Sequence, residues 1–157
     1  MGEEKLPADG LAPVFVLIDD DREASQKITA VLPGDWLFVP VAQPSVAIGY
    51  ARHFAPTAIL LAEPLDYPRG GAARLLQELL DEVGKPVIIL TEDWSPDVAA
   101  HWQRMGASNC IPHPTRSLRR MDVLRESLKC AIAAWDPGGA IAASLTHQAA
   151  RDQGEMK

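Results

Sequence analysis

Val14-Phe15-Val16-Leu17-Ile18-Asp19-Asp20-Asp21 is the stretch of this 157-residue chain that decides the fold. Its first five residues are all apolar and rich in β-branched side chains, which is typical of a strand buried on both faces in a parallel sheet. Three aspartates follow directly, so acidic groups stand where this strand ends. We therefore predict an α/β domain whose sheet is covered by helices on both faces.

The same kind of apolar run returns four times along the chain. The further strands are expected at Trp36 to Val41, Ala58 to Ala62, Val87 to Leu90, and a short one around Asn109 to Ile111. Pro40 indicates that the second strand lies at an edge of the sheet or ends irregularly, because proline cannot donate a ladder hydrogen bond.

Helical spacing fills the segments between these strands. The helices are expected at Arg22 to Leu32, Ser45 to Phe54, Ala72 to Val83, Pro96 to Met105, and Ser117 to about Trp135. In the second of them, Val46, Tyr50 and Phe54 align on one face. Strands that alternate with helices of this length favour a doubly wound, five-stranded parallel sheet of the flavodoxin-like class.

The domain is expected to span residues 13–135, after an N-terminal extension at residues 1–12. The composition, 47% hydrophobic and 23% charged, is that of a globular chain. Asp136-Pro137-Gly138-Gly139 breaks the last helix, so residues 136–157 are predicted to be a tail or the start of a linker.

Charge and composition argue against several classes of function. A formal net charge of −6 gives no general attraction to nucleic acid or anionic membranes. No apolar run reaches the roughly 18 residues of a membrane span, and residues 1–10 lack the apolar core of an export signal. Cys110 and Cys130 have no metal-ligand spacing and are expected to be small buried hydrophobes. We expect a cytoplasmic protein.

Polar side chains follow the predicted strands at their carboxyl ends. Right-handed crossovers bring these ends to one edge of the sheet, where ligands of such folds bind. The residues expected to converge there are Asp19, Asp20, Asp21, Ala62, Glu63, Thr91, Glu92 and His113.

In this order and position, the segments of residues 13–135 resemble the receiver domain of two-component response regulators. The matching segments are Ile18-Asp19-Asp20-Asp21, Pro56-Thr57-Ala58-Ile59-Leu60-Leu61, Pro68 with Gly70-Gly71, Leu90-Thr91, and Gly106-Ala107-Ser108-Asn109-Cys110-Ile111 followed by His113-Pro114. The resemblance implies a (βα)5 fold and a role in phosphorelay signalling.

The resemblance also implies a particular chemistry. In such domains, acids after the first strand hold Mg²⁺ through oxygen ligands, and an aspartate on the third strand accepts a phosphoryl group. A lysine and the metal neutralise the developing charge, and a hydroxyl residue contacts the phosphoryl oxygens. Asp19 and Asp20 match the metal-binding acids, and Asp21 is either a spare acid or a helix N-cap. Without a third carboxylate, we expect weak Mg²⁺ binding.

The acceptor position falls on Ala62, and a methyl group cannot be phosphorylated. A one-residue shift would place Glu63 there, where its carboxylate could imitate a negative charge. Asp66, farther along the loop, is expected to be solvated.

Two further positions depart from the family pattern. His113 stands where the lysine is expected; it is either a pocket residue or a plain loop histidine, and the His113–Pro114 bond could keep the cis form that the family often has. Glu92 follows Thr91 where a small residue is usual, and we expect it to crowd the pocket and repel phosphate.

The family's fourth helix, fifth strand and fifth helix often form a dimer or partner surface. Trp94 and Trp102 lie at and within this fourth helix, either as interface residues or with one of them in the core. Arg116 and Arg119 could rim the same surface, and His101 is expected on the exposed side of the helix.

These observations favour a non-catalytic, phosphorylation-independent signalling and protein-interaction module, a pseudo-receiver that requires no cofactor and has protein partners, among them a second copy of itself. Two alternatives stay open. One is a phosphoacceptor that uses Glu63 or Asp66 with Mg²⁺. The other is a small-ligand-binding flavodoxin-like domain, which predicts an open apolar pocket at the strand ends.

Overall fold

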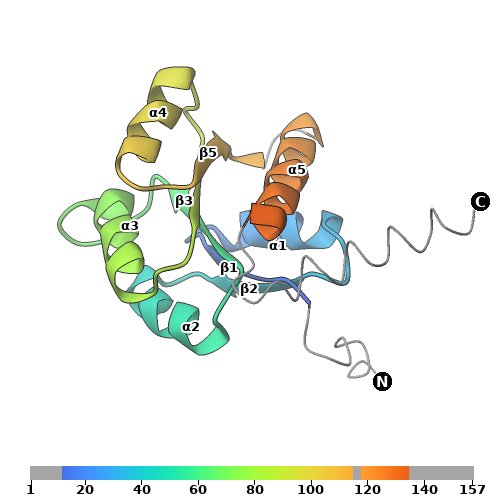
Figure 1. Ribbon diagram of the computed structural model, residues 1–157, viewed down its shortest axis with the longest axis horizontal. Helices are drawn as coiled ribbons and strands as arrows, with labels where there is room; N and C mark the ends of the chain where they lie inside the picture. Colours follow the sequence, from blue (N-terminus) through green and yellow to red (C-terminus); the bar gives the residue numbers. More distant parts are fainter. Residues whose placement is uncertain (1–11, 115–117, 135–157) are drawn as a thin grey trace, which may run out of the picture.

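The computed structural model describes residues 12–114 and 118–134, which form a five-stranded parallel sheet in the order β2-β1-β3-β4-β5 (Figure 1). The strands are β1 (Val14–Ile18), β2 (Leu37–Val41), β3 (Ala58–Glu63), β4 (Val87–Thr91) and β5 (Asn109–Pro112). The predicted flavodoxin-like architecture is confirmed. Strand β2, which contains Pro40, lies at one edge of the sheet as predicted.

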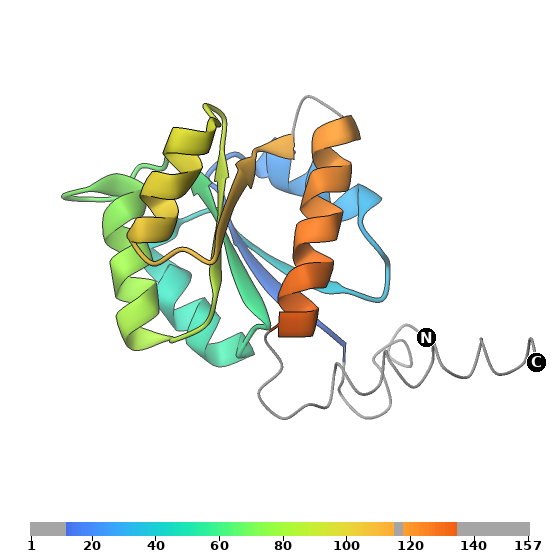
Figure 2. The ribbon, with the colours of Figure 1, turned by 45° about the horizontal axis from the view of Figure 1, so that its top comes forward.

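Helices cover both faces of this sheet. They are α1 (Arg22–Val31), α2 (Ala47–Phe54), α3 (Gly71–Glu82), α4 (Pro96–Arg104) and α5 (Leu118–Ala134), with a short 3-10 turn at Pro44–Val46 before α2. Figure 2 shows α1 and α5 on one face, and α2, α3 and α4 on the other. All five helices begin and end within a few residues of their predicted bounds.

The continuous apolar strands fill two cores at once. In β1, Phe15 and Leu17 pack in the core beneath α1 and α5, whereas Val16 and Ile18 pack in the core beneath α2, α3 and α4. All four side chains are fully buried. Successive residues of a strand face opposite sides, which explains why an unbroken apolar run is needed here.

Helix α2 turns a different face to the core from the one that its large apolar residues indicate. Ala47 and Ala51 are fully buried, whereas Val46 and Tyr50 are 41% and 44% exposed. The small alanine side chains let α2 pack closely on the sheet, and the larger residues, one position away on the helix, point outward. Tyr50 stacks on Phe54 instead, with ring centroids 6.1 Å apart.

The two cysteines differ. Cys110 is buried as predicted, but Cys130 lies on the outer side of α5 and is exposed, so the prediction for Cys130 was wrong. Residues 1–11 of the N-terminal extension, Trp135 and the tail after it lie outside the described residues. Among the helices that the structure describes, none has the length and apolar character of a membrane span.

Candidate functional site

A buried acid and a buried histidine meet at the carboxyl edge of the sheet. Nε2 of His113 lies 2.9 Å from Oδ2 of Asp19, and each side chain is about 4% exposed. Asp19 follows β1 and His113 follows β5, with β3 and β4 between them in the sheet. The pair therefore crosses the carboxyl ends of these two strands, and His113 is a pocket residue rather than a plain loop histidine.

Asp19 is held by several backbone groups. The amide of Asp21 donates to Oδ1 of Asp19 at 2.9 Å, and the amide of Asp19 donates to the carbonyl of Val41 at 3.1 Å. Asp21 is the N-cap of α1, because its carboxylate accepts from the amide of Ala24 at 3.1 Å. Asp20 and Asp21 are both exposed. Of the three acids, only Asp19 thus points into the buried site.

The imidazole of His113 has one unused nitrogen. A carboxylate only accepts hydrogen bonds, so Nε2 carries the proton that is shared with Asp19. Nδ1 is buried and has no hydrogen-bond partner in the part of the chain that the structure describes. The backbone of this loop is fixed on both sides: the amide of His113 donates to the carbonyl of Thr91 at 2.8 Å, and Arg120 of α5 donates to the carbonyl of His113 at 3.1 Å.

A second pair lies on the other side of the sheet. Glu63 and Thr91 are register partners at the ends of β3 and β4. The hydroxyl of Thr91 donates to Oε1 of Glu63 at 2.7 Å and accepts from the amide of Asp93 at 3.2 Å. Thr91 is 1% exposed. A side-chain hydrogen bond between an acid and a hydroxyl therefore links β3 and β4 at their carboxyl ends.

Ala62 and Glu63 face opposite sides of β3 because neighbouring strand residues alternate. Ala58 and Leu60 belong to the core beneath α1 and α5, so Ala62, two residues on, faces the side of the Asp19–His113 pair. Ala62 is 3% exposed. The two positions considered as phosphoryl acceptor, Ala62 and Glu63, thus face opposite sides of the sheet.

The charge of Glu63 is felt by a neighbouring thiol. Burial, and after it the negative charge of Glu63, raises the pKa of Cys110 from 9.0 to about 11. Cys110 lies on β5 and is 2% exposed. The carboxylate of Glu63 therefore acts on the thiol of Cys110 on β5 as well as on the hydroxyl of Thr91.

Two cavities flank Glu63. One, of about 370 Å³, is lined by Glu63, Thr91, Asp93, Asp97, Val98, His101 and Trp102. The other, of about 280 Å³, lies against Pro64, Leu65 and the start of α3. His101 is exposed as predicted and lies edge-on against Trp102, with centroids 5.8 Å apart.

The acids after β1 make a poor magnesium site in this arrangement. Within the described residues, no three His, Cys, Asp or Glu side chains gather as a metal-binding group. Both oxygens of Asp19 already have protein partners, and Asp20 is exposed. Mg²⁺ requires near-octahedral oxygen ligands, so binding would have to displace these partners. The weak site predicted at Asp19 and Asp20 stays a prediction.

Three sequence expectations about the pocket loops meet different outcomes. Glu92 is exposed, and Asp93 rather than Glu92 lines the cavity beside Thr91, so the expected crowding by Glu92 was wrong. Asp66 is exposed as expected. Among the residues described, the cis peptide bond lies at Glu63–Pro64 and not at His113–Pro114.

The residues proposed for an interface differ in their exposure. Trp94 is 41% exposed, and its indole N–H donates to the carbonyl of Cys110 at 2.8 Å. Trp102 is 7% exposed and packs in the core beneath α2, α3 and α4, so of the two alternatives for this pair the structure favours the one with a tryptophan in the core, and Trp102 is not an interface residue. Arg119 is exposed. Arg116 lies outside the described residues.

Comparison with known proteins supports the fold. No family model matches the sequence, and no curated protein matches it. The receiver domain of the Francisella response regulator 1452 is similar in structure, with a TM-score of 0.64, 18% identity, and coverage of 76% of this chain and 95% of that one. A response regulator from Desulfuromonas acetoxidans has a TM-score of 0.61 and 18% identity, and the match covers 75% of this chain and 98% of that one. The response regulator domain of Thermotoga maritima CheB has a TM-score of 0.62 and 17% identity, with coverage of 76% of this chain and 93% of that one. At these identities the likeness establishes the receiver fold.

Proposed function

We propose that this chain is a signalling and protein-interaction module with a receiver fold that works without phosphorylation. In this proposal it is a pseudo-receiver with no catalytic step of its own. The carboxylate of Glu63 supplies a built-in negative charge beside Thr91, the residue that matches the hydroxyl which contacts the phosphoryl group in the family.

The observation that carries this proposal is the 2.7 Å hydrogen bond from Thr91 to Glu63. The family resemblance implies that the hydroxyl at the position of Thr91 contacts a phosphoryl oxygen. Here the same hydroxyl is already bonded to a carboxylate oxygen of the chain, and Thr91 is buried. A hydroxyl that is satisfied in this way gains little from an added phosphate.

The Asp19–His113 pair supports the proposal from the other side of the sheet. The position that matches the family's lysine holds an imidazole, and this imidazole is bonded to the acid that matches a metal ligand. The basic group that would attract a phosphate and the acid that would hold its metal ion are therefore bonded to each other. Ala62 faces this pair and offers no nucleophilic atom.

A receiver that lacks phosphate control responds only to a ligand or partner that binds its conformations unequally. We propose a protein partner, or a second copy of this chain, on the surface formed by α4, β5 and α5. Trp94 is an exposed aromatic residue beside this surface, and Arg119 lies on the exposed side of α5. Nucleic-acid and membrane binding form no part of the proposal.

The competing function is a phosphoacceptor that uses Glu63 or Asp66 with Mg²⁺. Incubation with acetyl phosphate and Mg²⁺, followed by intact-mass measurement, separates the two. An aspartate-bearing receiver domain treated in parallel shows that the donor is active. We expect an unchanged mass for this chain, and a gain of one phosphoryl group would overturn the proposal.

The other alternative, a small-ligand-binding flavodoxin-like domain, would use the cavities that flank Glu63. Their walls carry Glu63, Asp93 and Asp97 in addition to apolar side chains, which differs from the open apolar pocket that this alternative predicts. A thermal-shift screen of neutral apolar ligands tests it. Stabilisation that the E63Q substitution abolishes would favour this function over ours.

A further inference from the structure

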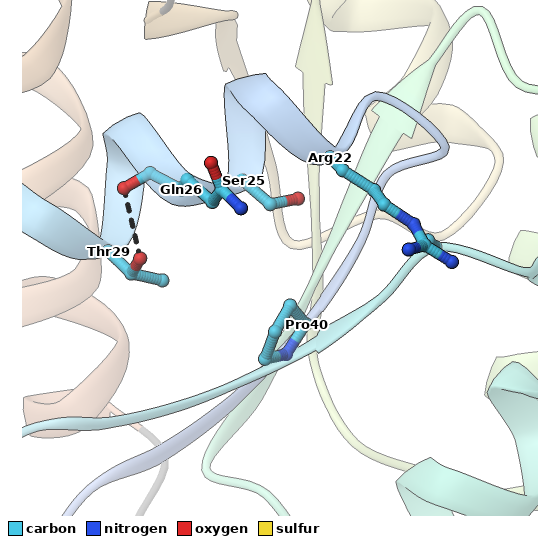
Figure 3. A pocket seen from close by; sticks show the side chains of 6 residues that line it. Arg22, Ser25, Gln26, Thr29 and Pro40 are labelled. Carbon is cyan, nitrogen blue, oxygen red and sulfur yellow. Dashed lines mark hydrogen bonds between the residues drawn. The ribbon is translucent and has the colours of Figure 1, made fainter.

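A third cavity lies between α1 and the carboxyl end of β2, and it shares no lining residue with the two cavities beside Glu63. Its volume is about 310 Å³, and it is lined by Arg22, Ser25, Gln26, Thr29, Pro40 and Ala42. Figure 3 shows Arg22, Ser25, Gln26 and Thr29 along one side of α1, with Pro40 of β2 across from them. This volume is at the lower end of the range for small-molecule sites.

Ser25 is the unusual member of this wall. Its side chain is buried, with the residue 5% exposed, yet its hydroxyl has no hydrogen-bond partner among the residues that the structure describes. A buried hydroxyl without a partner is unfavourable, and the great majority of such groups are satisfied in native proteins. The hydroxyl of Ser25 can therefore donate a hydrogen bond to a ligand on this side of α1.

Arg22 adds a cation one turn earlier on the same helix. It is exposed, and it lines the cavity beside Ser25. A guanidinium presents several N–H donors in one plane, which suits a carboxylate or a phosphate. Arg22 and Ser25 together offer a charged and a neutral donor to the same oxyanion.

The remaining wall residues are the polar Gln26 and Thr29 on α1, and Pro40 and Ala42 across from them. Pro40 and Ala42 are apolar, and Pro40 has no backbone N–H to offer. The hydroxyl of Thr29 donates to the carbonyl of Gln26 at 3.1 Å (Figure 3), so its proton is already used within the helix. An apolar body suits this end of the cavity better than a second charge.

We propose that the cavity between α1 and β2 binds a small organic oxyanion, with its charged end at Arg22 and Ser25 and its apolar body against Pro40 and Ala42. The N-terminus of α1 is not the site, because the carboxylate of Asp21 already caps it. This inference goes beyond the proposed function and does not depend on the role of Glu63.

Benzoate is a suitable probe because it combines a carboxylate with a compact apolar ring. The full chain, labelled with ¹⁵N, is titrated with benzoate, with benzyl alcohol as a neutral analogue and with inorganic phosphate as an oxyanion without an apolar body. The variants are R22Q, S25A and, as a matched control, K27Q. Lys27 is an exposed cation of the same helix that pairs with Glu23 and does not line the cavity.

The expected result is saturable binding of benzoate with amide shifts at residues 22–29 and 40–42. The dissociation constant should rise at least about tenfold in R22Q, rise less in S25A, and stay unchanged in K27Q. Phosphate should bind more weakly than benzoate, and stronger phosphate binding would identify an inorganic anion as the ligand instead. Equal binding of benzyl alcohol, retention in R22Q, or no binding by the wild-type chain would overturn the proposal. Urea unfolding of each variant verifies that it is folded.

Discussion

Nε2 of His113 and Oδ2 of Asp19 are 2.9 Å apart although 94 residues separate them in the chain and two strands separate them in the sheet. The contact is possible because it passes over the carboxyl ends of β3 and β4. Ala62 ends in a methyl group on that side of β3. An aspartate at this position would bring a second carboxylate close to Asp19, so Ala62 and the buried pair suit each other.

The buried pair should contribute strongly to stability. In H113A, the buried carboxyl of Asp19 loses its imidazole partner, and we expect a loss of about 3 kcal/mol in the free energy of unfolding. Urea unfolding of H113A, D19N and the double variant measures this. H101A, which removes an exposed histidine, serves as the control and should change stability little. Wild-type stability in both single variants would show that the contact is not formed in solution.

The two tryptophans at α4 should respond in opposite ways. W102A removes a side chain from the core and should cost about 3–5 kcal/mol of unfolding free energy. W94A removes a half-exposed indole and should change stability much less. If a homodimer forms through α4, β5 and α5, W94A should shift it toward monomer. Urea unfolding and light scattering at several protein concentrations measure both effects; equal destabilisation by the two substitutions would contradict the assignment of core and surface.

The raised pKa of Cys110 predicts a dependence of stability on alkaline pH. In the folded chain this pKa is about 11, against 9.0 for an ordinary thiol. Between pH 9.0 and 11 the thiol is therefore ionised in the unfolded chain but still protonated in the folded one, so the free energy of unfolding falls as the pH rises. Wild type should lose about 1–2 kcal/mol more than C110A over this range. C130A, which removes the exposed thiol, should behave like wild type. Urea unfolding at both ends of the range gives the comparison, and parallel losses in C110A and wild type would contradict it.

The strands and helices could be predicted because their signals are local. Val14 to Ile18 is apolar at every position, and only a strand buried on both faces requires this. The core-facing side of α2 could not be predicted in the same way. Val46 and Tyr50 carry more apolar surface than Ala47 and Ala51, but the helix buries the alanines because close packing on the sheet favours small side chains.

The sequence predicted which residues lie in the site, but it did not predict which of their side chains bond to each other. The convergence of Asp19, Glu63, Thr91 and His113 follows from the parallel topology, which brings all strand ends together. Which side chain bonds which depends on strand parity and on loop paths that the sequence does not reveal. The bond from Arg120 to the carbonyl of His113 is an example, because no local pattern distinguishes Arg120 from the neighbouring arginines.

In the proposed function, the charge of Glu63, and not a phosphoryl group, sets the state of Thr91 and the adjoining α4. Amide spectra of the ¹⁵N-labelled full chain test it most directly, recorded for wild type, for wild type with acetyl phosphate and Mg²⁺, and for E63Q. The side-chain amide introduced by E63Q keeps an acceptor for Thr91 and removes the charge. We expect the phosphodonor to leave the amide signals of Thr91, Asp93 and α4 unchanged, whereas E63Q should shift them. Shifts of these amides with the phosphodonor, and none with E63Q, would contradict it.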